Sequence, residues 1–124
     1  MSAWSAGEVA GIGRATELQV ASRRPDGTLR PFVTIWAVRA GDGLYVRSAY
    51  GDENPWFQRA LLSGESRIRA GGVERDVRFE VPGQEVADTV SAAYHAKYDR
   101  YGASIVATVV SDEATRATLG VLPA

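Results

Sequence analysis

The sequence contains no cysteine and only one histidine, His95. The absence of cysteine excludes thiol nucleophiles, thiolate zinc sites and disulfide scaffolds, and it is compatible with a reducing cytoplasm. A single imidazole is too few for a histidine-based metal site, so we predict that the protein has no metal site. His95 is also the only candidate base for a Ser-His-Asp triad, and its place in a predicted helix favours a solvated surface histidine.

Neither sign of charge dominates, and long apolar runs are absent. Arg and Lys together number 14 and Asp and Glu 15, which gives a formal net charge of -1. Such a balance provides no field for binding nucleic acid or an anionic membrane, so we expect neither partner. No segment approaches the ~18 apolar residues of a membrane span, and residues 1–13 show neither a basic leader nor an apolar signal-peptide run. We therefore expect a cytoplasmic protein.

The chain is long enough for one hydrophobic core. Its 124 residues, 45% of them hydrophobic, predict a single domain spanning residues 1–124. At this length folding buries roughly two thirds of the surface that the unfolded chain exposes. A core of that size does not need a disulfide or a structural metal.

Turn signals divide the first half of the chain into strands. The run Arg24-Pro25-Asp26-Gly27 separates a predicted strand at 17–22 from one at 29–39. The run Gly41-Asp42-Gly43 then separates the strand at 29–39 from a strand at 44–48. In the 29–39 strand both alternating sets of side chains are largely apolar, which predicts a strand covered on both faces.

Charge pairing predicts the register of a second hairpin. If Gly71 and Gly72 form a two-residue turn, opposite charges face each other on one side of the sheet. The pairs are Arg69 with Glu74, Arg67 with Asp76, and Glu65 with Arg78.

Helices are predicted around these strands. Ser5 and Glu8 form a capping box that begins a short helix ending near Gly13. Further helices are predicted at 55–62, 84–98 and 104–111, and a last strand near 118–122. Five or six strands in hairpins, with helices inserted late, indicate an α+β protein built on a small antiparallel β-barrel.

One strand end has the composition of an anion site. Arg47 and Ser48, followed by Gly51, supply a planar guanidinium, a hydroxyl and exposed loop amides, the donors that a phosphate requires. The alternative is a solvated arginine and a turn glycine at an ordinary strand end. All basic residues except Lys97 are arginine. This preference reflects either the nucleotide composition of the genome or the use of guanidinium groups to bind anions.

Three further residues have two interpretations each. Arg30 enters the 29–39 strand and is either a functional charge or a solvated edge residue. Trp36 and Trp56 are suited to stacking on a ligand ring, although packing in a core or an interface is the commoner use of tryptophan.

Convincing acids, bases and nucleophiles are scarce in the sequence. This scarcity favours either a protein whose bound cofactor carries the chemistry or a protein without catalytic activity.

Several stretches resemble a bacterial protein family of unknown function. The similarity extends from about Glu17 to Leu122, and it is also shared, more distantly, with deazaflavin-dependent nitroreductases and other flavin-binding split barrels. The stretches are Gly27-Thr28-Leu29-Arg30-Pro31, Ile35-Trp36-Ala37-Val38-Arg39, Leu44-Tyr45-Val46-Arg47-Ser48, Trp56-Phe57-Gln58-Arg59-Ala60 and Ile68-Arg69-Ala70-Gly71-Gly72.

This resemblance implies a small antiparallel split β-barrel of about six strands with two to four short helices. It also implies a homodimer that holds FMN or an F420-like deazaflavin between its subunits. The cofactor-binding residues that it indicates are Arg30, Thr34, Arg47, Ser48, Ala49, Gly51 and Trp56.

The sequence departs from the nitroreductases at two places. Residues 22–28 contain no lysine where those relatives have a stretch rich in Gly, Lys, Arg and Ser, and Trp56 is followed by Phe57-Gln58 where they tend to have Asn-Leu. Which flavin is bound, or whether any cofactor is bound, therefore stays open.

Two functions follow: an oxidoreductase that transfers hydride to a small organic acceptor, or a non-catalytic dimer that binds a small anionic or aromatic ligand. The sequence leaves both catalytic activity and the substrate open.

Overall fold

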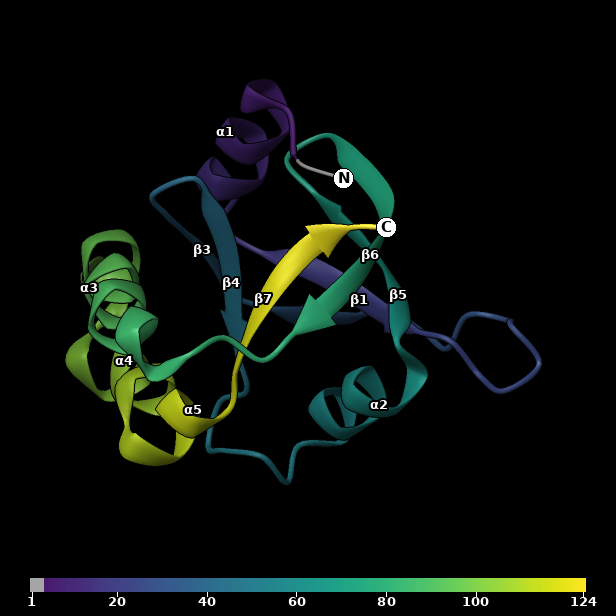
Figure 1. Cartoon of the computed structure of the whole chain (residues 1–124). Helices are drawn as coiled ribbons and strands as arrows, with labels where there is room; N and C mark the ends of the chain where they lie inside the picture. The colour runs from purple at the N-terminus through teal and green to yellow at the C-terminus, as the bar shows by residue number, and fades with distance from the viewer. Residues whose placement is uncertain (1–3) are drawn as a thin grey trace.

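The computed structural model describes residues 4–124, so residues 1–3 of the predicted domain lie outside the described residues. Its strands form one antiparallel sheet, and its helices pack around that sheet (Figure 1). The strands are β1 (Leu18–Ser22), β2 (Val33–Ile35), β3 (Ala37–Ala40), β4 (Gly43–Arg47), β5 (Glu65–Ala70), β6 (Val73–Glu80) and β7 (Thr118–Pro123). The helices are α1 (Ala6–Arg14), α2 (Pro55–Ser63), α3 (Ala87–Tyr98), α4 (Ala103–Val110) and α5 (Asp112–Arg116), with short 3-10 turns η1 (Gln84–Val86) and η2 (Asp99–Tyr101).

The sheet curls into a nearly closed barrel. Its strand order is β2-β1-β5-β6-β7-β4-β3, so β2 and β3 occupy the two edges. These two strands are nevertheless consecutive in the chain and are separated only by Trp36. The two edges must therefore approach each other at this residue, which brings the sheet close to full circle (Figure 1). The predicted α+β fold with an antiparallel split barrel is confirmed.

The long strand predicted at 29–39 is broken in the structure. Leu29 forms only an isolated bridge with Arg23, and regular pairing resumes in β2 and again in β3. The prediction of cover on both faces is correct for β3, where Ala37 and Val38 are buried, and wrong for β2, where Val33 and Thr34 are exposed. The physical reason is that β2 is an edge strand of the sheet. It pairs with β1 on one side, and its other edge is open.

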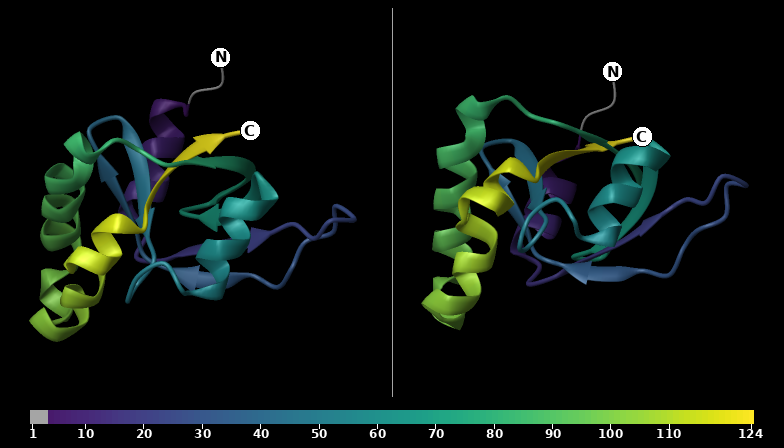
Figure 2. Two further views of the ribbon diagram at one scale, coloured as in Figure 1. Left: turned by 60° about the horizontal axis from the view of Figure 1, so that its bottom comes forward. Right: turned by 90° about the horizontal axis from the view of Figure 1, so that it is seen from below.

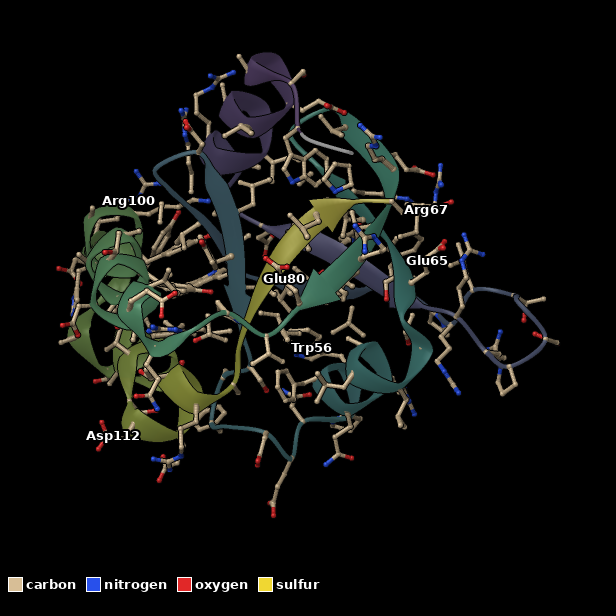
Figure 3. The ribbon with its side chains drawn as sticks, viewed as in Figure 1. Trp56, Glu65, Arg67, Glu80, Arg100 and Asp112 are labelled. Carbon is tan, nitrogen blue, oxygen red and sulfur yellow. The ribbon has the colours of Figure 1, made fainter. Side chains whose placement is uncertain are left out.

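The predicted register of the β5–β6 hairpin is confirmed. Arg69 lies opposite Glu74, Arg67 opposite Asp76, and Glu65 opposite Arg78. Arg69 Nε lies 2.9 Å from Glu74, and Arg67 Nη1 lies 2.8 Å from Asp76. Hydrogen bonds from Arg67 hold the pKa of both the Glu74 and the Asp76 carboxyl below its usual value. Figure 3 shows Glu65 and Arg67 on the same strand, on the outer side of the barrel.

The predicted capping box at the start of α1 is also confirmed. The Glu8 amide donates to the Ser5 hydroxyl, and the Ser5 amide donates to the Glu8 carboxylate at 3.0 Å. The same carboxylate lies 3.0 Å from Arg75 Nη1, so the arginine that interrupts the apolar pattern of β6 is paired with α1.

The core divides into two apolar clusters. One fills the barrel and includes Trp56, Phe57 and Ala60 of α2, which closes one end of the barrel. The other lies between the outer face of β3 and the helices α3 and α4, around Tyr94 and Tyr98. Figure 2 shows α3, α4 and α5 grouped on one side of the barrel, with α2 apart from them. None of the helices in residues 4–124 has the length and apolar character needed to cross a membrane.

Candidate functional site

A cavity of about 350 Å³ opens between β2, the loop after β4, the start of α2 and α4. We call it the aromatic cavity. It is lined by Val33, Thr34, Ile35, Trp36, Arg47, Ala49, Tyr50, Asn54, Trp56, Ile105, Thr108 and Val109. Four of the seven predicted cofactor-binding residues therefore meet here, namely Thr34, Arg47, Ala49 and Trp56.

Two tryptophans form rigid walls of the aromatic cavity. Trp36 lies at the break between β2 and β3 and stacks on Tyr98 with ring centroids 3.9 Å apart. Trp56 follows Pro55 at the start of α2 and meets Phe57 edge to face at 5.9 Å. Figure 3 shows Trp56 between α2 and the strands of the barrel. Flat, fixed aromatic walls suit a planar ring in the space beside them.

The rim of the aromatic cavity is unusually apolar. Val33, Tyr50 and Ile105 expose 38%, 80% and 48% of their surface, and they come from three separate segments of the chain. Single exposed apolar residues are common on soluble proteins, whereas several around one opening are typical of ligand-binding or subunit-contact surfaces.

Arg47 lies in the wall of the aromatic cavity, and its side chain is only 2% exposed. Its Nε donates to Thr118 Oγ1 at 2.9 Å, and its Nη2 donates to the Ala87 carbonyl at 2.9 Å. Its Nη1 donates to Ser91 Oγ at 2.8 Å and to the Val109 carbonyl at 3.0 Å. The sequence pattern shows no partner for Arg47, whereas the structure gives it four neutral ones. Burial lowers the pKa of its guanidinium.

Ser48 and Gly51 support the loop beside the cavity and do not line it. Ser48 is fully buried, and its Oγ has no hydrogen-bond partner within the described residues. Gly51 has a φ of 111°, and a Cβ placed there would lie 3.2 Å from the Cβ of Glu113 in α5. Glycine is thus favoured at position 51 by its backbone conformation, and a side chain there would press against α5.

Arg30 lies in a different depression, which we call the arginine hollow. The hollow has a volume of about 390 Å³ and is lined by Arg23, Arg24, Pro25, Arg30, Arg59, Leu62 and Ser63. No carboxylate is among these lining residues. Arg23 pairs with Asp76 at 2.9 Å and Arg24 donates to the Leu29 carbonyl, whereas the buried Nε of Arg30 has no partner within residues 4–124. An anion in the hollow would meet the Arg30 guanidinium among lining residues that include no carboxylate.

The aromatic cavity and the arginine hollow lie along the same helix. Trp56 lines the cavity from the first turn of α2, and Arg59 and Leu62 line the hollow from its later turns. At a rise of ~1.5 Å per residue, Leu62 lies about 9 Å along the helix axis from Trp56. Arg59, which sequence reasoning missed as a site residue, follows Trp56 within one turn of α2 but is exposed, whereas Trp56 is buried.

The aromatic cavity supplies little acid-base chemistry of its own. Asp, Glu, His and Lys are absent from its lining residues. Lys97, nearby on α3, donates instead to the Ala37 carbonyl at 2.6 Å, and partial burial lowers its pKa to about 8. In the part of the chain that the structure describes, no three His, Asp or Glu side chains gather as metal ligands would. A bound cofactor would supply redox chemistry that these side chains do not offer.

Solved structures with a similar fold include proteins that bind flavins. A protein described as an F420 reductase matches with a TM-score of 0.53 and 15% identity, over 97% of this chain and 94% of its own. An FAD-binding protein from Mesorhizobium loti matches with a TM-score of 0.55 and 13% identity, over 97% and 88%. A third structure, described as a domain-swapped dimer, matches with a TM-score of 0.57 and 12% identity, over 86% and 79%. At these identities the matches show a shared fold.

No curated protein matches the chain. A family model does match it, over residues 8–121, which is nearly its whole length. The chain therefore belongs to DUF2255, the family described as an uncharacterized protein conserved in bacteria.

Proposed function

We propose that the protein binds a flavin or deazaflavin and transfers hydride to a small organic acceptor. The observation that carries the proposal is the pairing of an aromatic cavity without acidic residues and an arginine hollow along one helix. An aromatic ring joined to a phosphate by a short flexible chain matches both ends of this arrangement. FMN and deazaflavins have this form, and the FAD-binding and F420 reductase structures share the barrel.

The residues fit such a ligand. Trp36 and Trp56 would hold the ring between apolar faces, and Arg30, helped by Arg59, would hold the phosphate. Thr34 and the unpaired edge of β2 offer hydrogen-bonding groups to the polar rim of the ring, and Ala49 leaves room for it. The bound flavin or deazaflavin supplies the hydride chemistry.

The remaining predicted residues act on the ligand through the fold. Arg47 fixes β4 against α3, α4 and β7, so it keeps the cavity wall in place. Ser48 and Gly51 shape the loop that carries Ala49. We therefore assign the phosphate to Arg30 and not to Arg47, because the four contacts of Arg47 commit its guanidinium within the protein.

Fluorescence titration tests this function. Purified protein should bind FMN or a deazaflavin with a Kd below ~1 mM, which corresponds to a binding free energy more favourable than about -4 kcal/mol. Failure of both cofactors to bind up to that concentration would refute the proposal.

We also propose that the protein works as a homodimer. The open edge of β2 and the exposed Val33 and Ile105 at the cavity rim form a surface that a second subunit would cover. Dimer assembly is seen in the similar structure described as domain-swapped. Sedimentation of the wild type at tens of micromolar should give a dimer, and the substitution Ile105→Glu should dissociate it. A wild-type monomer under these conditions would count against the homodimer.

A second candidate function is non-catalytic binding of a small aromatic anion. It is favoured by the lack of acidic residues, histidine and lysine in the lining of the aromatic cavity. Steady oxidation of a reduced cofactor by an acceptor, lost in an Arg30→Gln variant that stays folded, would exclude it.

A further inference from the structure

The loop at the mouth of the aromatic cavity contains an unusual turn. The Gly51 amide donates to the Ser48 carbonyl at 3.1 Å, so Ala49 and Tyr50 are the two central residues of a β-turn. Tyr50 has a φ of 67°, and among the described residues it is the one non-glycine residue with a positive φ. A negative φ followed by a positive φ is the arrangement of a type II turn, whose second central position favours glycine or asparagine.

Tyrosine at this position brings no evident benefit to folding. The side chain is 80% exposed, so little of its apolar surface is buried against the protein. A bulky side chain in the left-handed region is also strained relative to glycine or asparagine. The surrounding structure nevertheless enforces the conformation, because the Tyr50 amide donates to the Thr108 carbonyl of α4 at 3.2 Å and Gly51 packs against Glu113 of α5. Enforced strain of this kind is typical of functional sites.

The position of Tyr50 indicates what its ring does. Tyr50 lines the aromatic cavity together with Trp36 and Trp56, and it is the most exposed of the three aromatic residues. The two tryptophans are held in place by Tyr98 and Phe57, whereas the exposed Tyr50 ring has room to change rotamer. A ring bound beside the tryptophans would therefore leave one face toward the mouth, where Tyr50 lies.

We propose that Tyr50 is the stacking residue that covers the bound ring and shields it from water. This inference rests on the proposed function and assigns one residue to the ring end of the same site. Burial of the tyrosine ring against a ligand would provide the apolar contact that it lacks in the free protein. The role requires an aromatic ring at position 50, and it does not require the phenolic hydroxyl.

The test compares Tyr50→Asn and Tyr50→Phe with the wild type, using riboflavin and FMN as probes. Tyr50→Asn keeps a residue that tolerates the turn and removes the ring, so we expect its thermal midpoint to stay equal or rise by a few degrees. Its affinity for both probes should fall by at least about tenfold. Tyr50→Phe should keep both affinities within about twofold of the wild type, and so should the control Leu61→Ala, which truncates a half-exposed apolar residue outside both pockets.

Each other outcome overturns the proposal in a recognisable way. Unchanged affinity of Tyr50→Asn, with a wild type that binds, refutes the stacking role and leaves the proposed function standing. A lowered thermal midpoint for Tyr50→Asn would contradict the premise that the ring brings no benefit to folding, on which the stacking role rests. Absence of binding by the wild type refutes the proposed function and the stacking role together.

Discussion

Replacing Arg47 by alanine should lower the free energy of unfolding by about 3–5 kcal/mol, a large part of the stability of a small domain. The guanidinium is buried and makes four hydrogen bonds, with Ala87, Ser91, Val109 and Thr118. The substitution empties the space of a long side chain and strips two backbone carbonyls of their charged donor. Each buried polar group left without a partner costs about 1–3 kcal/mol.

Urea unfolding of the Arg47→Ala variant measures this loss, with Arg39→Ala as the matched control. Arg39 lies on the neighbouring strand β3, is exposed, and donates through Nε to the Gly41 carbonyl. Its removal should change the stability by less than about 0.5 kcal/mol. Arg47→Met should fall between the two, because it refills the volume without burying a charge. A loss below about 1 kcal/mol for Arg47→Ala would contradict the framework role of Arg47.

The substitution Gly71→Ala should have the second large effect, a loss of about 3 kcal/mol or more in unfolding free energy. Gly71 has a φ of 55°, a conformation that disfavours alanine. A Cβ at this position would also clash with the backbone oxygen of Gly11, far inside van der Waals contact. Helix α1 would have to move, and its side chains Val9 and Ile12 are buried in the barrel.

Gly72 provides the matched control for this prediction. It occupies the same turn with a φ of 81°, and a Cβ there would meet nothing within 4 Å. Gly72→Ala therefore measures the cost of the backbone conformation alone, about 1 kcal/mol. Denaturant midpoints of the two variants should differ clearly. Equal losses in both would show that the approach of α1 to the β5–β6 turn contributes no constraint.

Local features of the fold were predictable from the sequence because their causes are local. The capping box needs only Ser5 and Glu8, three residues apart. The register of the β5–β6 hairpin follows from a two-glycine turn and from charges that repeat on alternate residues. In both cases the side chains that decide the structure lie within a few residues of one another.

The break at Trp36 could not be predicted in this way. Apolar side chains occupy both alternating sets from residue 29 to 39, so periodicity carries no sign of where the strand changes from one edge of the barrel to the other. Helix α5 was also missed. Its cap is visible in the sequence as Ser111 followed by acidic residues, but five residues are too few for a periodic pattern.

The site shows the same division between local and tertiary information. The resemblance placed Thr34, Ala49 and Trp56 together, and they do line one cavity. It could not indicate that Arg47 turns inward, because the hydrogen-bond partners of Arg47 are 40 to 71 residues away in the chain. Ile105 of the cavity rim was likewise missed, since it joins the site only through the packing of α4.

The most direct test of the central claim compares FMN with riboflavin, which has the same ring without the phosphate. Isothermal titration of the wild type should show FMN binding at least about tenfold more tightly than riboflavin. In Arg30→Gln the preference for FMN over riboflavin should shrink to within about twofold, while the affinity for riboflavin stays unchanged. The control variant Arg100→Gln, which changes an exposed arginine, should keep the full preference for FMN. Equal affinities of the wild type for the two compounds, or an undiminished preference in Arg30→Gln, would contradict a ring in the aromatic cavity with its phosphate at Arg30.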